Sequence, residues 1–223
     1  MGTPNYGRTK RTCYYTYLAM SSVFSLPSML FVTFRELYGI SYTLSGTLVL
    51  VNFVTQLGID LIFTFFSKHF NIRKTIRLMP LLTSAGMLLY ALSPLIFGGH
   101  VYAGLLIGTV LFSVSAGLSE VLLSPLIAAI PSENPDRDMS RLHSLYAYGV
   151  VSVVVISTVY FRLFGTENWQ YLTAFLALLP IFSFVMFSVS PIPEMNISEH
   201  GGGKTESGRR LGLALCVICI FLG

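Results

Sequence analysis

The chain has 223 residues, of which 53% are hydrophobic and 11% are charged, and its mean hydropathy is +0.70. Soluble domains carry about 25% charged residues, so this composition excludes an ordinary soluble domain, because too few charges are present to cover a surface that faces water. The sequence therefore predicts a protein that crosses the membrane several times. Its formal net charge of +4 then indicates contact with anionic lipid, and no nucleic-acid binding is expected.

The predicted elements are helices long enough to span a bilayer. A helix that crosses a hydrocarbon core of about 30 Å needs about 20 mostly apolar residues. Runs of that kind lie, in chain order, at residues 14–34, 42–66, 78–97, 101–130, 141–163 and 169–190. They lack the alternating pattern of membrane strands, so we expect an all-α membrane protein built as a six-transmembrane-helix bundle. The apolar run at 211–223 is too short to cross and is expected to be the start of a truncated seventh helix.

The basic residues predict the orientation, because Lys and Arg are retained on the cytoplasmic side. Of the 14 basic residues, only Arg35 and Arg162 lie in loops that would face outward. We therefore expect a multi-pass protein of the cell membrane with both termini in the cytoplasm. The expected organisation is a cytoplasmic tail at 1–13, the helix bundle at 14–190, a cytoplasmic linker at 191–210 and the seventh helix from 211.

Two local patterns are not interpreted as catalytic or metal sites. The stretch GGGKT at 201–205 ends like a phosphate-binding loop, but Ser198 stands where that motif needs its first glycine. Cys216 and Cys219 lie inside an apolar run, which favours packing over a redox or metal pair. We expect no enzymatic activity, no metal and no cofactor.

Glu120 carries the functional prediction. No charged residue lies between residues 101 and 119, and the next one downstream is Glu133. Counting back from Pro131 at 1.5 Å per residue places Glu120 roughly 16 Å inside the membrane, near its middle. A carboxylate at that depth costs about 3 kcal/mol on insertion scales, so an acid retained there indicates a function. The alternative is a buried structural pair.

Other polar residues lie inside the expected spans at helical spacing. On the second span Asn52, Gln56 and Asp60 follow each other at intervals of four and share one face. The third and sixth spans carry few polar groups away from their ends and are expected to face lipid. Small residues at this spacing also serve helix packing, and Asp60 could pair structurally. We expect proton coupling at Glu120, His143 and Asp60, and weaker substrate contacts at Ser25, Ser28, Asn52, Gln56 and Ser124.

Several stretches resemble a known family. GISYTLSGTLVLVNFVTQLGID, the basic turn KHFNIRK, AGLSEVLLSPLIAAI and SRLHSLYAYG resemble the N-terminal six-helix half of major facilitator superfamily transporters, of the fucose-permease-like sugar–cation symporter type. The family's Glu and Pro of the fourth helix, and its Leu-His and aromatic-Gly pairs of the fifth, match Glu120, Pro125, Leu142, His143, Tyr148 and Gly149. The signature between helices 2 and 3 differs, with Asn71 in place of its glycine and Lys68 in place of its acid.

The resemblance implies a secondary active transporter in which helices 1 and 4 line a central cavity. An acid on helix 4 would then take part in proton coupling and in contacts with sugar hydroxyls. The residues agree, since a carboxyl group at mid-membrane can load and release a proton and can accept hydrogen bonds from hydroxyls when ionised. We expect proton-coupled uptake of a sugar or a similar small polar solute by alternating access.

Two alternatives stay open, a drug or organic-ion facilitator and a membrane helix bundle without transport activity. Alternating access in this family moves one six-helix bundle against another. The chain is therefore expected to be an N-terminal fragment, whose partner is either a C-terminal half or a second copy of itself. Membrane lipids are the other expected partners.

Overall fold

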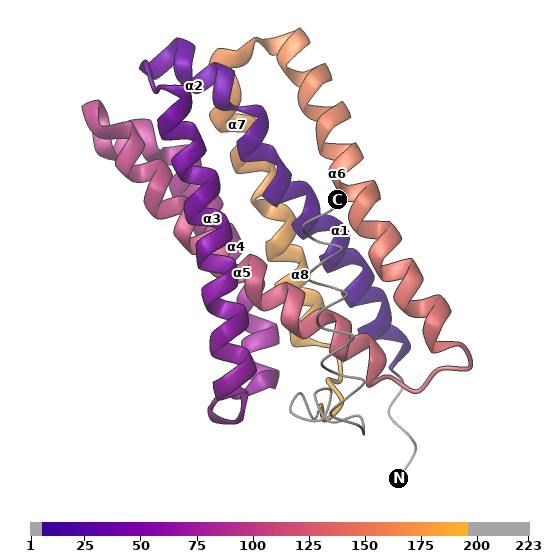
Figure 1. Ribbon diagram of the computed structural model, residues 1–223. Helices are drawn as coiled ribbons and strands as arrows, with labels where there is room; N and C mark the ends of the chain where they lie inside the picture. The colour runs from indigo at the N-terminus through magenta and orange to yellow at the C-terminus, as the bar shows by residue number, and fades with distance from the viewer. Residues whose placement is uncertain (1–5, 196–223) are drawn as a thin grey trace, which may run out of the picture.

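A computed structural model describes residues 6–195, and every regular element in this part is a helix (Figure 1). The long helices are α1 (Gly7–Met29), α3 (Tyr42–Phe66), α4 (Ile72–Phe97), α5 (Val101–Ala128) and α6 (Pro135–Phe164). Shorter helices are α2 (Phe31–Tyr38), α7 (Trp169–Leu176) and α8 (Leu178–Ser188), with single 3-10 turns at Ser67–His69, Gly98–His100 and Thr166–Asn168. Most of the expected linker and the expected seventh helix lie outside the described residues.

The helices are of membrane type, which confirms the predicted all-α membrane fold. Within residues 6–195, four apolar stretches are long enough to cross a bilayer, namely Tyr42–Phe63, Ile72–Ala128, Pro135–Phe164 and Thr166–Ser188. A fifth results if α1 and α2, which meet at an angle of 44°, are taken as one broken span. The stretch Ile72–Ala128 holds both α4 and α5. Six separate spans therefore stay a prediction.

Capping residues decide where three of the long helices begin. The side chains of Ser41, Asn71 and Asn134 each accept a hydrogen bond from the backbone N–H three residues further on. This satisfies one of the amide groups that the first turn of a helix leaves unpaired. Pro135 follows as the first residue of α6, where its missing N–H and fixed φ suit a helix start. Helix α1, in contrast, begins at Gly7, inside the stretch 1–13 that was expected to be tail.

Glycines set how closely the helices pack. Gly86 of α4 faces Phe112 of α5, and a Cβ at position 86 would stand 2.6 Å from the Phe112 backbone nitrogen. Gly117 of α5 faces Ile59 of α3 in the same way, at 2.9 Å from its Cβ. Small residues of this kind let helix backbones approach in membranes, where close packing replaces the hydrophobic effect as the source of association.

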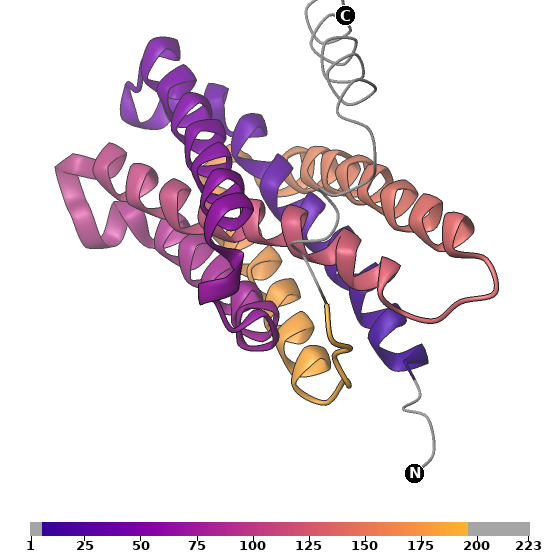
Figure 2. The same cartoon turned by 60° about the horizontal axis from the view of Figure 1, so that its bottom comes forward.

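The helices differ strongly in burial. Buried residues make up 56% of the apolar window in the α4–α5 stretch, but only 11% in α3 and 17% in α6. Figures 1 and 2 show α6 alongside α1, with α3 on the other side of the bundle. The expected third span, residues 78–97, lies in α4. It was expected to face lipid, but α4 packs against both α5 and α8. The small residues Ser84, Gly86 and Ser93 are among the buried residues of α4.

One polar cluster joins the beginnings of α1 and α6. Asp138 is buried, and its carboxylate accepts hydrogen bonds from Lys10 Nζ at 2.5 Å and from Tyr14 OH at 3.0 Å. Ser132, in the loop before α6, donates to the same carboxylate. This cluster fixes the two helix ends side by side and so determines which faces of α1 and α6 meet along their length.

Candidate functional site

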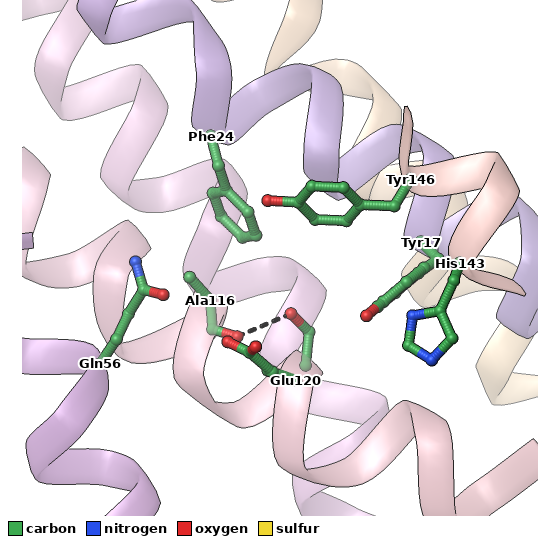
Figure 3. A pocket seen from close by; sticks show the side chains of 8 residues that line it. Tyr17, Phe24, Gln56, Ala116, Glu120, His143 and Tyr146 are labelled. Atoms are coloured by element: carbon green, nitrogen blue, oxygen red, sulfur yellow. Dashed lines mark hydrogen bonds between the residues drawn. The ribbon is translucent and has the colours of Figure 1, made fainter. Parts of the chain in front are cut away.

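Two hollows lie between α1, α3, α5 and α6. The first, which we call the Glu120 cavity, has a volume of about 340 Å³ and is shown in Figure 3. It is lined by Tyr17, Phe24, Gln56, Ala116, Ser119, Glu120, His143 and Tyr146. All four helices contribute polar side chains that converge on this space, with Gln56 on one side, Tyr17 and His143 on the other, and Glu120 between them (Figure 3).

The close contact between α3 and α5 positions Glu120. Helices α3 and α5 cross where Gly117 packs on Ile59. Glu120 lies on the next turn of α5, beyond this crossing. The Glu120 side chain is exposed in the cavity, while its neighbours Ala116 and Ser119 are buried. Ser119 Oγ donates to the Ala116 carbonyl at 2.8 Å, which satisfies this hydroxyl within its own helix. The carboxylate of Asp60, beside Ile59 on α3, interacts electrostatically with Glu120.

Aromatic rings form the side of the cavity opposite Gln56. The Tyr17 ring of α1 lies between two side chains of α6, with ring centroids 5.9 Å from His143 and 5.4 Å from Tyr146. The α1–α6 contact holds these rings in place, because Ser22 Oγ donates to the Gly149 carbonyl at 3.0 Å about one turn away. The cavity therefore combines one carboxylate, one imidazole and flat apolar surfaces.

The second hollow, the Asn52 cavity, has a volume of about 400 Å³. Its polar lining is neutral and consists of Ser25, Ser28, Asn52, Gln56, Thr109 and the Tyr146 hydroxyl. Asn52 Oδ1 accepts from Gln56 Nε2 at 2.9 Å and from Ser113 Oγ at 2.5 Å, which connects α3 to α5. Apolar side chains complete the wall: Phe24, Pro27, Met29, Phe31, Leu48, Val49, Phe53, Phe112, Val150 and Val154.

The structure brings most of the expected site residues to these two cavities. Glu120 and His143 line the first, Ser25, Ser28 and Asn52 line the second, and Gln56 lines both. Asp60 and Ser124 line neither of the two. Ser124 lies one turn beyond Glu120, and Asp60 interacts electrostatically with Glu120. Their expected roles stay predictions.

Sequence reasoning missed Tyr17 and Phe24, and it gave Tyr146 no role. Tyr17, Ser21, Phe24 and Ser28 follow each other at intervals of four, three and four, so they share one helical face. Ser28 on that face was selected for its hydroxyl group, while Tyr17 and Phe24 were given no role. Within residues 6–195 no group of three or more His, Cys, Asp or Glu side chains is placed to hold a metal ion.

The fold is similar to one solved transporter. It matches the crystal structure of D-xylose-proton symporter with a TM-score of 0.68 at 13% sequence identity, covering 83% of this chain and 48% of that chain. The chain thus spans about half the length of that symporter. At this identity the likeness concerns the fold alone. No family model matches the sequence, and none of the curated proteins does.

Proposed function

We propose that this protein is a secondary active transporter that takes up a sugar or a similar small polar solute together with protons. The observation that carries the proposal is Glu120, a carboxylate exposed in a cavity between four helices of a membrane fold. Ionisable residues at membrane depth are costly and mark ion and substrate pathways. The fold likeness to a sugar–proton symporter supports the same conclusion.

The chemistry of the site suits proton coupling. Glu120 takes up a proton when the cavity is open to the more acidic side and releases it to the other side. His143, across the cavity, and Asp60, next to Glu120, are the secondary participants. When Glu120 is ionised, its oxygens accept hydrogen bonds from solute hydroxyls. The rings of Tyr17 and Tyr146 offer flat surfaces for the C–H face of a sugar ring.

Solute recognition is proposed for the neutral polar groups. Ser25, Ser28, Asn52 and Gln56 present hydroxyl and amide groups that can both donate and accept, as a polyol requires. Ser124, beyond Glu120 on α5, is a weaker candidate. Specificity of this kind arises because a solute that lacks one hydroxyl leaves a buried polar group unpaired.

The arrangement in the membrane is also a proposal. We infer six spans with both termini in the cytoplasm, from the distribution of the basic residues. Alternating access in these folds moves two bundles against each other around a site at their interface. The exposed faces of α3 and α6 would then meet a second bundle, supplied either by a C-terminal half or by a second copy of this chain.

A second candidate, export or uptake of an organic cation, has its own support. Tyr17, Phe24 and Tyr146 line the same cavity as the Glu120 carboxylate, and aromatic rings beside a carboxylate attract cations.

Uptake into proteoliposomes that contain the purified protein distinguishes sugar–proton transport from organic-cation transport. D-xylose, a panel of other sugars and a panel of organic cations are each measured with and without an inward proton gradient. Accumulation of a neutral sugar that collapses with the gradient supports the first function, and gradient-driven movement of cations alone supports the second.

A further inference from the structure

The two cavities are stacked along the same four helices. Relative to the Glu120 cavity, which uses residues 116–120 of α5 and 143–146 of α6, the Asn52 cavity uses the adjoining residues 109–112 and 146–154. The lining of α1 shifts in the same way, from 17–24 to 24–29, and Phe31 of α2 adds to the second lining. Only three side chains line both, and these are Phe24 of α1, Gln56 of α3 and Tyr146 of α6.

The chemistry of the two cavities is separate. Glu120 and His143, a carboxylate and an imidazole that can bind a proton, line the Glu120 cavity and not the Asn52 cavity, as does Tyr17. The Asn52 cavity has no carboxylate and no imidazole in its lining, and its one titratable group is the shared Tyr146. Neutral hydrogen-bonding groups are therefore grouped on one side of the three shared side chains and proton-binding groups on the other.

Each shared side chain is held by a neighbour. The Phe24 ring stacks on buried Phe112, with centroids 6.3 Å apart and an angle of 27° between the rings. Tyr146 packs against Tyr17, and Gln56 Nε2 donates to Asn52 Oδ1. Figure 3 shows the hydroxyl end of Tyr146 directed toward Phe24, with Gln56 on the opposite side of the cavity.

We infer that Phe24, Gln56 and Tyr146 form a partition between a solute compartment, the Asn52 cavity, and a protonation compartment, the Glu120 cavity. In this arrangement Tyr146 determines how strictly proton movement depends on solute. The inference rests on the proposed transport function and deepens it, because it separates the space that recognises the solute from the space that handles the proton. A solute in the Asn52 cavity reaches the protonation compartment only through Gln56 and the Tyr146 hydroxyl.

The dimensions explain why such a partition matters. From Tyr17 to Met29 the two cavities extend over 12 residues of α1, which corresponds to about 18 Å at 1.5 Å per residue. The hydrocarbon core is about 30 Å thick. If the cavities were joined, a continuous polar path would cover most of the membrane, and protons could cross without solute.

Proton leak tests the partition without any solute. The purified 223-residue protein is reconstituted into vesicles that contain a pH-sensitive dye, and the rate of internal acidification after an external acid pulse is measured. Tyr146→Ala and Phe24→Ala should each raise this rate several-fold over the wild-type protein, because each opens the partition. Tyr146→Phe, which keeps the ring, should leave the rate unchanged. Tyr171→Ala is the matched control, since Tyr171 is 71% exposed on α7 and lines neither cavity.

Circular dichroism and the amount of reconstituted protein establish that each variant is folded. Folded Tyr146→Ala and Phe24→Ala proteins that leak no faster than the wild type would overturn the inference. So would a Tyr146→Phe protein that leaks as fast as Tyr146→Ala, because the barrier would then be the hydroxyl and not the ring. Failure of the proposed function gives a different result, namely a wild-type protein without gradient-driven uptake, whatever the order of the leak rates.

Discussion

Gly149 of α6 packs directly against Ser21 of α1, with no room for a single methyl group between the two helices. A Cβ at position 149 would overlap both Ser21 Oγ and the carbonyl oxygen of Leu18. The contact lies close to Tyr17 and Tyr146, so the same crossing that holds α1 on α6 also places the aromatic side of the Glu120 cavity.

Gly149→Ala should therefore destabilise the protein. Because the Leu18 carbonyl belongs to the backbone, the helices must move apart, and overpacking of this kind costs about 1–3 kcal/mol. Gly46→Ala is the control, since a Cβ at this exposed position of α3 meets nothing within 4 Å. It should be neutral or stabilising by up to about 1 kcal/mol. Thermal unfolding in detergent measures both, and equal melting temperatures would contradict the close α1–α6 contact.

The Lys10–Asp138 pair should stabilise the ends of α1 and α6. Lys10→Ala leaves a buried carboxylate with only Ser132 and Tyr14 as donors, and loss of a hydrogen bond to a charged group costs about 2 kcal/mol. The double exchange Lys10→Asp with Asp138→Lys should recover part of the loss in melting temperature. Arg73→Ala, which breaks an exposed pair with Glu194, should change the melting temperature little. A similar loss in both single variants would argue against a special role for the Lys10 pair.

Glu120→Gln should abolish proton-driven accumulation while the protein stays folded. The amide keeps the shape of the side chain and its hydrogen-bonding capacity but cannot exchange a proton. Solute exchange at equal concentrations on both sides should persist, because it needs no net proton movement. Glu133→Gln, in the exposed loop before α6, is the control. If Glu120→Gln lost expression or helix content instead of coupling, a structural pair would be the better explanation of this residue.

Asn52→Ala should weaken solute affinity. Asn52 Oδ1 is the acceptor that orients Ser113 and Gln56, and removing it leaves both donors without this partner. A loss of about 1–1.5 kcal/mol corresponds to roughly a tenfold rise in KM. Thr47→Ala on the same helix is the control, because its hydroxyl is exposed and bonds within α3. A drop in the maximal rate at constant KM would place Asn52 outside the solute site.

Labelling of single cysteines checks the orientation. In a background without Cys13, Cys216 and Cys219, a membrane-impermeant thiol reagent added to intact cells should modify cysteines placed at Gly99 and Thr166. A cysteine at Asn134 should react only after the membrane is opened. Labelling of Asn134 from outside would reverse the assignment made from the basic residues.

Local rules were enough to predict the helices. The apolar run at 42–66 coincides with α3, and the beginning of α5 at Val101 agrees as well. Low charge, apolar runs of membrane length and capping residues such as Ser41 and Asn71 act within one segment, so they can be recognised without knowing the neighbours.

What the sequence by itself determined is thus the all-α membrane fold, most helix boundaries and the unusual position of Glu120. Only the tertiary structure decided which polar residues share a cavity. Asn52, Gln56 and Asp60 lie on one face of α3, yet Asp60 lines neither cavity, whereas Asn52 and Gln56 do. Likewise, Tyr17 and Phe24 became site residues only through the packing of α6 against α1. Helical periodicity fixes the faces of one helix, whereas the contacts between helices depend on small residues far apart in the chain.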